Sequence, residues 1–128
     1  MSGDERFLLT TRVSGTDATD DNYIFNTTGG KILVESVSFG PDTSVATHAS
    51  NYITTTVSIA GTTLTSHGTD SATGSALTAG TLKALTLVAG VGEVAAAGTI
   101  RVQVAKAGTG PAYDFVVYAM CKRMRGGI

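Results

Sequence analysis

The chain has 128 residues, of which 42% are hydrophobic and 15% charged, and its formal net charge is −1. This hydrophobic fraction excludes a disordered chain, and a domain of this length can bury a core without disulfides. With almost no net charge, the chain lacks the overall field that attracts nucleic acid or an anionic membrane, so neither is an expected partner.

The hydrophobic pattern predicts about eight strands and no helix of ordinary length. The expected strands cover residues 7–13, 23–26, 31–39, 51–60, 62–65, 81–88, 99–106 and 113–124. Polar loops at 40–50 and 66–79 separate some of them, and the alanine-rich stretch 94–97 is too short to nucleate a helix. Short strands with Gly-rich turns are typical of a sandwich or barrel. We therefore predict an all-β, jelly-roll-like β-sandwich of about eight antiparallel strands.

The clearest strand covers residues 99–106, where Ile100, Val102 and Val104 alternate with polar side chains. A turn at 107–112 leads into the run 113–124, so these two strands are expected to form the central hairpin. In strand 31–39 the apolar residues change phase, which indicates burial on both faces or a bulge. The predicted core consists of Ile53, Val57, Ile59, Ile100, Val102, Val104, Phe115 and Val117.

The domain is expected to span residues 1–128, with short ends, about 1–6 and 124–128, outside the patterned strands and flexible in the free protein. No apolar run is long enough to span a membrane, and residues 1–30 lack a signal-peptide pattern. We expect synthesis in a reducing cytoplasm. The single cysteine, Cys121, shares the phase of the core residues and is expected to be buried.

No catalytic constellation is recognisable. Residues 90–95 match the G-x-G-x-x-A dinucleotide pattern, but a strand resumes at about Gly98, and the helix that the motif needs has no room. His48 and His67 are placed in polar loops near Asp42 and Asp70. We interpret both as solvated histidines, with a surface metal site as the alternative. The sequence therefore predicts no enzyme, no cofactor and no metal.

Candidate contact residues come from the charge distribution and from one tyrosine. Acidic residues gather early in the chain, whereas Lys122, Arg123 and Arg125 lie near its end. These basic residues either contact a complementary partner or face water. Tyr52 is on the polar face of strand 51–60, where it is a candidate for partner contact or for sugar stacking.

Five segments of the chain, most of them Thr-, Ala- and Gly-rich, share a pattern of strand and turn types. They are residues 51–54, 74–81, 85–87, 94–102 and 105–110. Together these segments resemble the jelly-roll head decoration (cement) proteins of tailed bacteriophages. The resemblance implies a virion structural protein, commonly a homotrimer, that binds the major capsid protein on the outer surface of the head and stabilises the capsid. The basic end, residues 122–128, is not part of the pattern.

Two other functions remain as alternatives. Jelly rolls also serve as carbohydrate-binding or receptor-binding modules, which need an exposed aromatic residue beside polar loop groups. A cupin-type enzyme would need a cluster of His and Glu on strands, and this chain lacks one.

Overall fold

The computed structural model describes residues 5–16 and 19–124, which form nine strands and no helix. The strands are β1 (Arg6–Gly15), β2 (Asp20–Phe25), β3 (Ile32–Pro41), β4 (Tyr52–Ile59), β5 (Thr62–Gly68), β6 (Lys83–Leu85), β7 (Glu93–Val94), β8 (Thr99–Ala107) and β9 (Tyr113–Arg123). In this part of the chain there is accordingly no helix that is long and apolar enough to cross a membrane.

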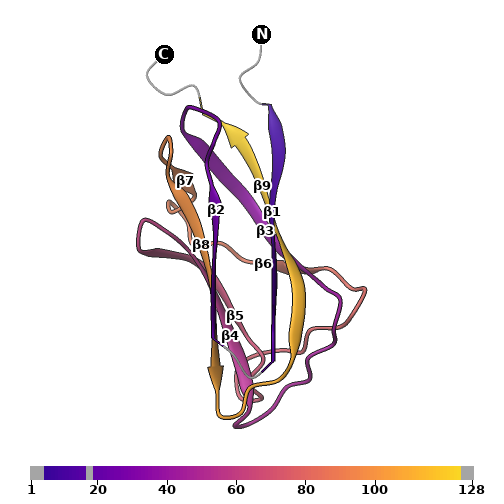
Figure 1. Cartoon of the computed structure of the whole chain (residues 1–128). Coiled ribbons are helices and arrows are strands. Elements are labelled where there is room, and N and C mark those ends of the chain that lie inside the picture. Colours follow the sequence, from indigo (N-terminus) through magenta and orange to yellow (C-terminus); the bar gives the residue numbers. More distant parts are fainter. Residues whose placement is uncertain (1–4, 17–18, 125–128) are drawn as a thin grey trace.

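The strands form two antiparallel sheets that pack face to face (Figure 1). Sheet A has the order β1-β9-β3-β6, with β7 also paired to β3, and sheet B has the order β2-β8-β4-β5. Because β6 and β7 both pair with β3, they occupy one strand position in two pieces. The result is eight positions in two four-stranded sheets, the arrangement of a jelly roll. The all-β, jelly-roll-like sandwich predicted from the sequence is confirmed.

The core lies between the sheets and follows the alternation of the strands. Each of the eight residues predicted for the core is at most 5% exposed, and Cys121 is fully buried, as predicted. The rings of Phe39 and Phe115, on the two central strands of sheet A, meet with their centroids 4.8 Å apart. Side chains of one phase on each strand thus supply one continuous core.

The predicted hairpin between strands 99–106 and 113–124 is wrong. β8 pairs with β2 and β4 in sheet B, whereas β9 pairs with β1 and β3 in sheet A. The turn between them carries the chain from one sheet to the other, with Gly108 at φ +60° and the Thr109 N–H bonded to Asn51 Oδ1 at 2.9 Å. An alternating pattern defines which face of a strand is buried but not which strand lies beside it.

Several strands differ in length from the prediction, among them the expected strands 81–88 and 62–65. The expected strand 81–88 is reduced to β6, because the chain then leaves β3 and bonds to β5 instead. Thr65 Oγ1 donates to the Thr86 carbonyl at 2.8 Å, and Val88 N–H donates to the Leu64 carbonyl at 2.8 Å. The expected short strand 62–65 extends to Gly68. The first residues assigned to the polar loop 66–79 therefore belong to β5.

The change of phase within β3 is a bulge at Glu35, one of the two readings that the sequence allowed. Val34 and Ser36 face the consecutive residues Cys121 and Met120 of β9, so Glu35 has no partner in the ladder. The bulge frees the Glu35 side chain to pair with basic residues on the outside of sheet A.

The described parts of both chain ends are bonded to the sandwich. Arg6 is the first residue of β1 and lies opposite Lys122, so the leader predicted over residues 1–6 ends before it. Glu5 accepts a backbone hydrogen bond from Arg123, and Met124 donates one to Lys31 at 3.0 Å. The remainder of the two predicted flexible ends, residues 1–4 and 125–128, lies outside the described residues.

Candidate interaction surfaces

The histidines have structural partners rather than a shared ligand. His48 Nδ1 accepts hydrogen bonds from the N–H groups of Ser50 and Asn51 at 3.0 and 2.9 Å, which fixes a turn. His67 is not in a loop as predicted. It lies in β5 with its ring edge-on to Phe39, and its Nε2 is 3.0 Å from Ser75 Oγ. Burial lowers the pKa of His67, because the charged form loses its hydration.

The two acids considered with these histidines are also engaged elsewhere. Asp70 accepts hydrogen bonds from the N–H and hydroxyl of Thr73, both at 2.9 Å, and these bonds lower the pKa of Asp70. Asp42 pairs with Arg12 at 2.9 Å. Within residues 5–16 and 19–124, no group of three His, Cys, Asp or Glu side chains converges as metal ligands would.

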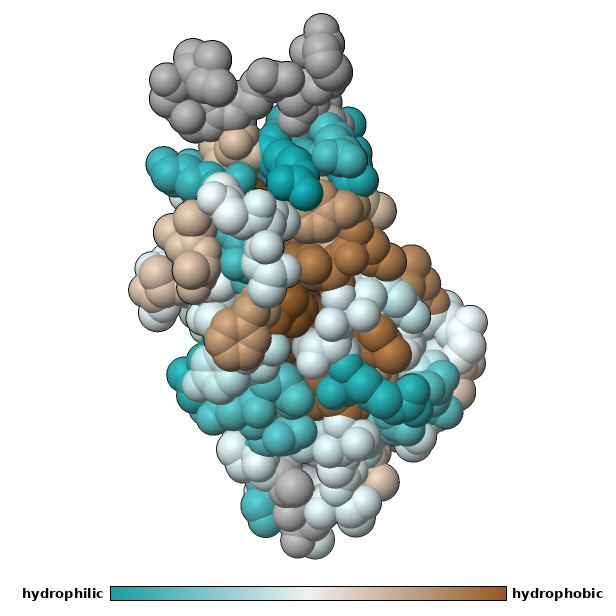
Figure 2. Space-filling view, turned by 45° about the horizontal axis from the view of Figure 1, so that its top comes forward, coloured by the Kyte–Doolittle hydropathy of each residue, from teal (hydrophilic) through white to brown (hydrophobic). Residues whose placement is uncertain are grey.

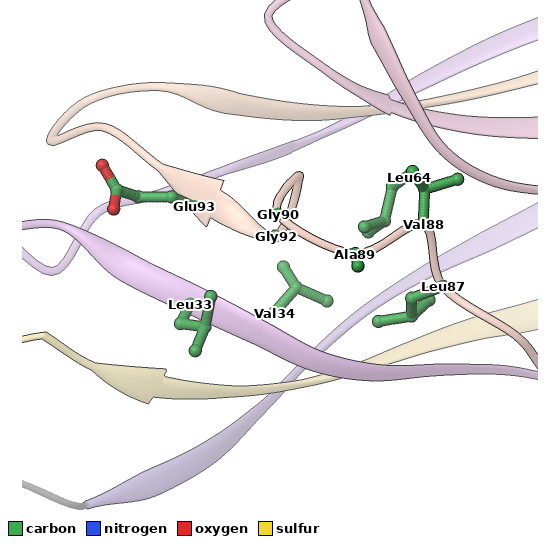
Figure 3. Close-up of a pocket in the computed structure, with 9 residues that line it drawn as sticks. All are labelled: Leu33, Val34, Leu64, Leu87, Val88, Ala89, Gly90, Gly92 and Glu93. Carbon is green, nitrogen blue, oxygen red and sulfur yellow. The ribbon is translucent and has the colours of Figure 1, made fainter.

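The glycine-rich segment that matches the dinucleotide pattern lines an aliphatic pocket of about 330 Å³ (Figure 3). The Gly92 carbonyl accepts a hydrogen bond from Val34 N–H at 2.8 Å, and the chain continues directly into β7, so no helix follows. The one carboxylate at the pocket, Glu93, points away from the aliphatic side chains and pairs with Lys31 at 3.2 Å. The pocket arises where β6 and β7 are interrupted, and it lacks the convergent polar groups of a catalytic site.

The outer surface of sheet A, which we call the sheet A face, has an apolar centre. Leu8 of β1 lies opposite Met120 of β9 and is 48% exposed. The next outward residue of β9 is Tyr118, whose ring lies over Gly40 of β3, at a position where a Cβ atom would be only 2.7 Å from the ring. Val116 continues the row on β9. The centre of this face therefore offers a weakly polar area.

Compensated charges border the sheet A face at both ends. At one end Glu35 Oε1 is 2.7 Å from Arg6 Nε, and its Oε2 is 3.8 Å from Lys122 Nζ. At the other end, Arg12 lies 2.9 Å from the carboxylate of Asp42 and 2.8 Å from that of Asp114. These contacts raise the pKa of Arg12, and the hydrogen bond with Asp114 contributes most to the shift. Lys122, one of the predicted contact residues, thus has a partner within its own chain.

The other predicted contact residues are dispersed. Arg123 Nε is 3.2 Å from Glu5 Oε1, and its guanidinium lies 5.9 Å from the centroid of the Phe7 ring. Arg125 lies outside the described residues. Tyr52 begins β4 opposite Ala107, next to the β8–β9 connection, whereas Lys122 and Arg123 are at the far end of β9. The structure therefore does not bring Tyr52 and the basic residues into one site.

The outer surface of sheet B, the sheet B face, is rich in Thr and Ser and carries two exposed aromatic residues. Tyr23 and Phe25, on the edge strand β2, are 48% and 62% exposed. Beside Tyr23, the carboxylate of Asp21 receives two hydrogen bonds from Arg101, at 2.9 and 3.1 Å. Sequence analysis did not single out Phe25. Its alternation with buried Ile24 is the signal that locates it on the outer face.

A hollow of about 570 Å³ lies beside Phe25, lined by Phe25, Asn26, Thr27, Gly29, Ala96 and Ala97. We call it the Phe25 hollow. The wall of the hollow is mostly apolar; its polar groups are backbone atoms, the exposed Thr27 and Asn26, which is 3% exposed. More generally, the surface in Figure 2 shows hydrophobic residues gathered in a central band between hydrophilic regions, rather than scattered singly.

Comparison with known proteins finds a shared fold. No protein-family model and no curated protein matches the chain. Among solved structures, one similar chain belongs to the structure described as "Cyanophage Pam1 capsid asymmetric unit". The two are 23% identical, with a TM-score of 0.53, and the match covers 95% of this chain and 87% of the other. At this identity the likeness extends to the fold alone.

Proposed function

We propose that the protein is a structural component of a bacteriophage virion, a decoration protein that binds the outer surface of the head and stabilises the capsid. The observation that carries this proposal is a jelly roll shared over nearly its whole length with a chain of a cyanophage capsid asymmetric unit. The resemblance to head decoration proteins supports the same role; it covers residues 51–54, 74–81, 85–87, 94–102 and 105–110. Its partner is then the major capsid protein.

The surface chemistry fits a protein that acts by contact rather than by catalysis. On the sheet A face the apolar centre supplies area to bury, and the Arg and Lys groups at its ends already have carboxylate partners. A partner that covers this face leaves few charges without a counter-ion, which keeps the desolvation cost low. We therefore assign the sheet A face, which Lys122 borders, to the capsid contact.

The remaining parts of the proposal follow from the resemblance. The protein is made in the host cytoplasm, self-associates as a homotrimer, and attaches to the outside of the assembled head. It acts without enzymatic activity. Each copy must then stay soluble before attachment, and the outward Thr54, Thr56 and Ser58 of β4 on the sheet B face are suited to this requirement.

The direct test is binding of the purified protein to undecorated heads, measured by co-sedimentation. We expect saturable binding, and we expect Leu8→Glu on the sheet A face to weaken it. Thr56→Glu on the sheet B face is the matched control, because it adds the same charge to the outer face of the other sheet. Absence of saturable binding by the wild-type protein would refute the proposal, and equal weakening by both variants would remove the sheet A face from it.

A carbohydrate- or receptor-binding module is the second candidate. Exposed Tyr23 beside the fixed Asp21–Arg101 pair combines a stacking surface with hydrogen-bonding groups, as sugar sites do. Titration with a panel of glycans tests this function. If the protein is such a module, we expect it to bind some of the glycans, and we expect Tyr23→Ala to abolish this binding.

A further inference from the structure

Phe25 is the most exposed aromatic residue among the large exposed hydrophobic side chains of the described chain, at 62%. It occupies the last position of β2, which pairs with β8 on one side and is the edge of sheet B on the other. A side chain of this size in water is unfavourable for an isolated molecule, because its apolar area stays hydrated. The exposed position of the Phe25 ring therefore indicates that the ring contacts another molecule.

The Phe25 hollow has small residues and a fixed shape. Gly29, Ala96 and Ala97 form part of its wall and leave room that larger side chains would fill. Asn26 connects the two loops around it, donating to the carbonyls of Gly30 and Ala95 at 2.8 and 2.9 Å. Its backbone N–H also donates to the Gly98 carbonyl at 2.9 Å. The hollow is thus preorganised to receive an apolar group.

We propose that a second copy of this chain docks here, with the Phe25 ring of one copy seated in the Phe25 hollow of the next. This inference rests on the self-association within the proposed function and names the surface that mediates it. The projecting ring and the receiving hollow are adjacent on one molecule. In a homotrimer, a threefold axis near Phe25 therefore brings the ring of each copy to the hollow of the next, and three such contacts close the assembly.

The charges around Phe25 also fit an identical partner. A surface that meets its own copy faces its own charges, so any net charge there is repulsive. Here the nearest charged outward residue on β2, Asp21, is paired with Arg101 through two hydrogen bonds. Among the described residues, none of those that line the hollow has an ionisable side chain. The described surface around Phe25 is therefore locally neutral, and self-association separates none of these charges from its counter-ion.

The test measures the mass of the full chain by light scattering or sedimentation over about a hundredfold range of concentration. We expect the wild-type protein to self-associate and Phe25→Ser to weaken association by about tenfold or more per contact. Leu82→Ser and Val88→Ser are matched controls, because these residues are 63% and 52% exposed and do not line the hollow. They are expected to associate like the wild type.

A second variant tests the hollow without removing the ring. Ala96→Leu fills the hollow from its own chain and is expected to weaken association as much as Phe25→Ser does. A mixture of the two variants restores one contact in part, because the Ala96→Leu copy retains the ring and the Phe25→Ser copy retains the hollow except for the Phe25 part of its wall. Association in the mixture that neither variant shows alone would support the proposal, even if both variants melt at a lower temperature than the wild type.

The outcomes separate this inference from the proposed function. A monomeric wild-type protein, or an oligomer that survives both variants, overturns the inference while head binding remains measurable by itself. If the wild type is monomeric and Phe25→Ser loses head binding, the occupant of the hollow is the capsid protein and the inference is wrong. Self-association that depends on Phe25 without any head binding would uphold the inference and refute the capsid role.

Discussion

Val102 at the middle of β8 tests how strongly the core defines this fold. Its side chain is fully buried between Val57 of β4 and Asn22 of β2, which flank it in the sheet. Val102→Asp loses about 1.5–3 kcal/mol of apolar burial. A carboxyl group without a partner adds about 1–3 kcal/mol. The combined loss of about 2.5–6 kcal/mol is a large part of the 5–15 kcal/mol that usually stabilises a domain.

Ionisation increases this penalty and makes it depend on pH. Burial raises the pKa of a carboxyl group at this position above its value of about 3.9 in the unfolded chain. The unfolded chain therefore releases its proton first, and the variant loses stability as pH rises from about 4 towards the raised folded-state pKa. Val102→Asn has similar size without the charge, so its deficit relative to the wild type is expected to stay constant with pH.

The assay is urea denaturation followed by circular dichroism at about pH 4 and pH 7, with each variant compared with the wild type at the same pH. Ala105→Asp is the control, because Ala105 is an exposed residue of the same strand with the opposite phase. We expect it to change the denaturation midpoint little. Equal midpoints for Val102→Asp and Ala105→Asp at pH 7 would refute the burial argument.

Three further predictions follow from buried polar and ionisable groups. Burial lowers the pKa of His67, so wild-type stability should fall as pH decreases below about 6.5, the pKa of histidine in the unfolded chain. The variant His67→Gln should flatten this part of the curve of unfolding free energy against pH. The Thr55 hydroxyl is buried without a hydrogen-bond partner, so Thr55→Val should raise the unfolding free energy by about 1–2 kcal/mol in urea titrations, and unchanged stability would contradict this. Desolvation raises the pKa of Cys121 to about 11, so its thiol should resist Ellman's reagent in the native protein and react once urea unfolds the chain. A rapid reaction of the native protein with the reagent would contradict this prediction, because it would show an accessible thiolate.

The sequence alone determined the class of fold and the content of the core. Side chains alternate between the faces of a strand, so the spacing of Ile100, Val102 and Val104 identified a buried face before any partner strand was known. The same reasoning placed Cys121 inside and located the irregularity of β3 at the change of phase. These properties depend on neighbours along the chain, and local patterning is sufficient to define them.

Only the tertiary structure decided which strands are neighbours and which surface residues meet. β8 and β9 follow each other closely in sequence yet lie in different sheets, because a five-residue turn can cross between layers as readily as it closes a hairpin. Lys122 acquired its partner, Glu35, through the bulge in β3, and Phe25 lies beside Ala96 through the meeting of two loops. Such contacts join residues far apart in sequence, and they are fixed by the packing of the whole sandwich rather than by any local pattern.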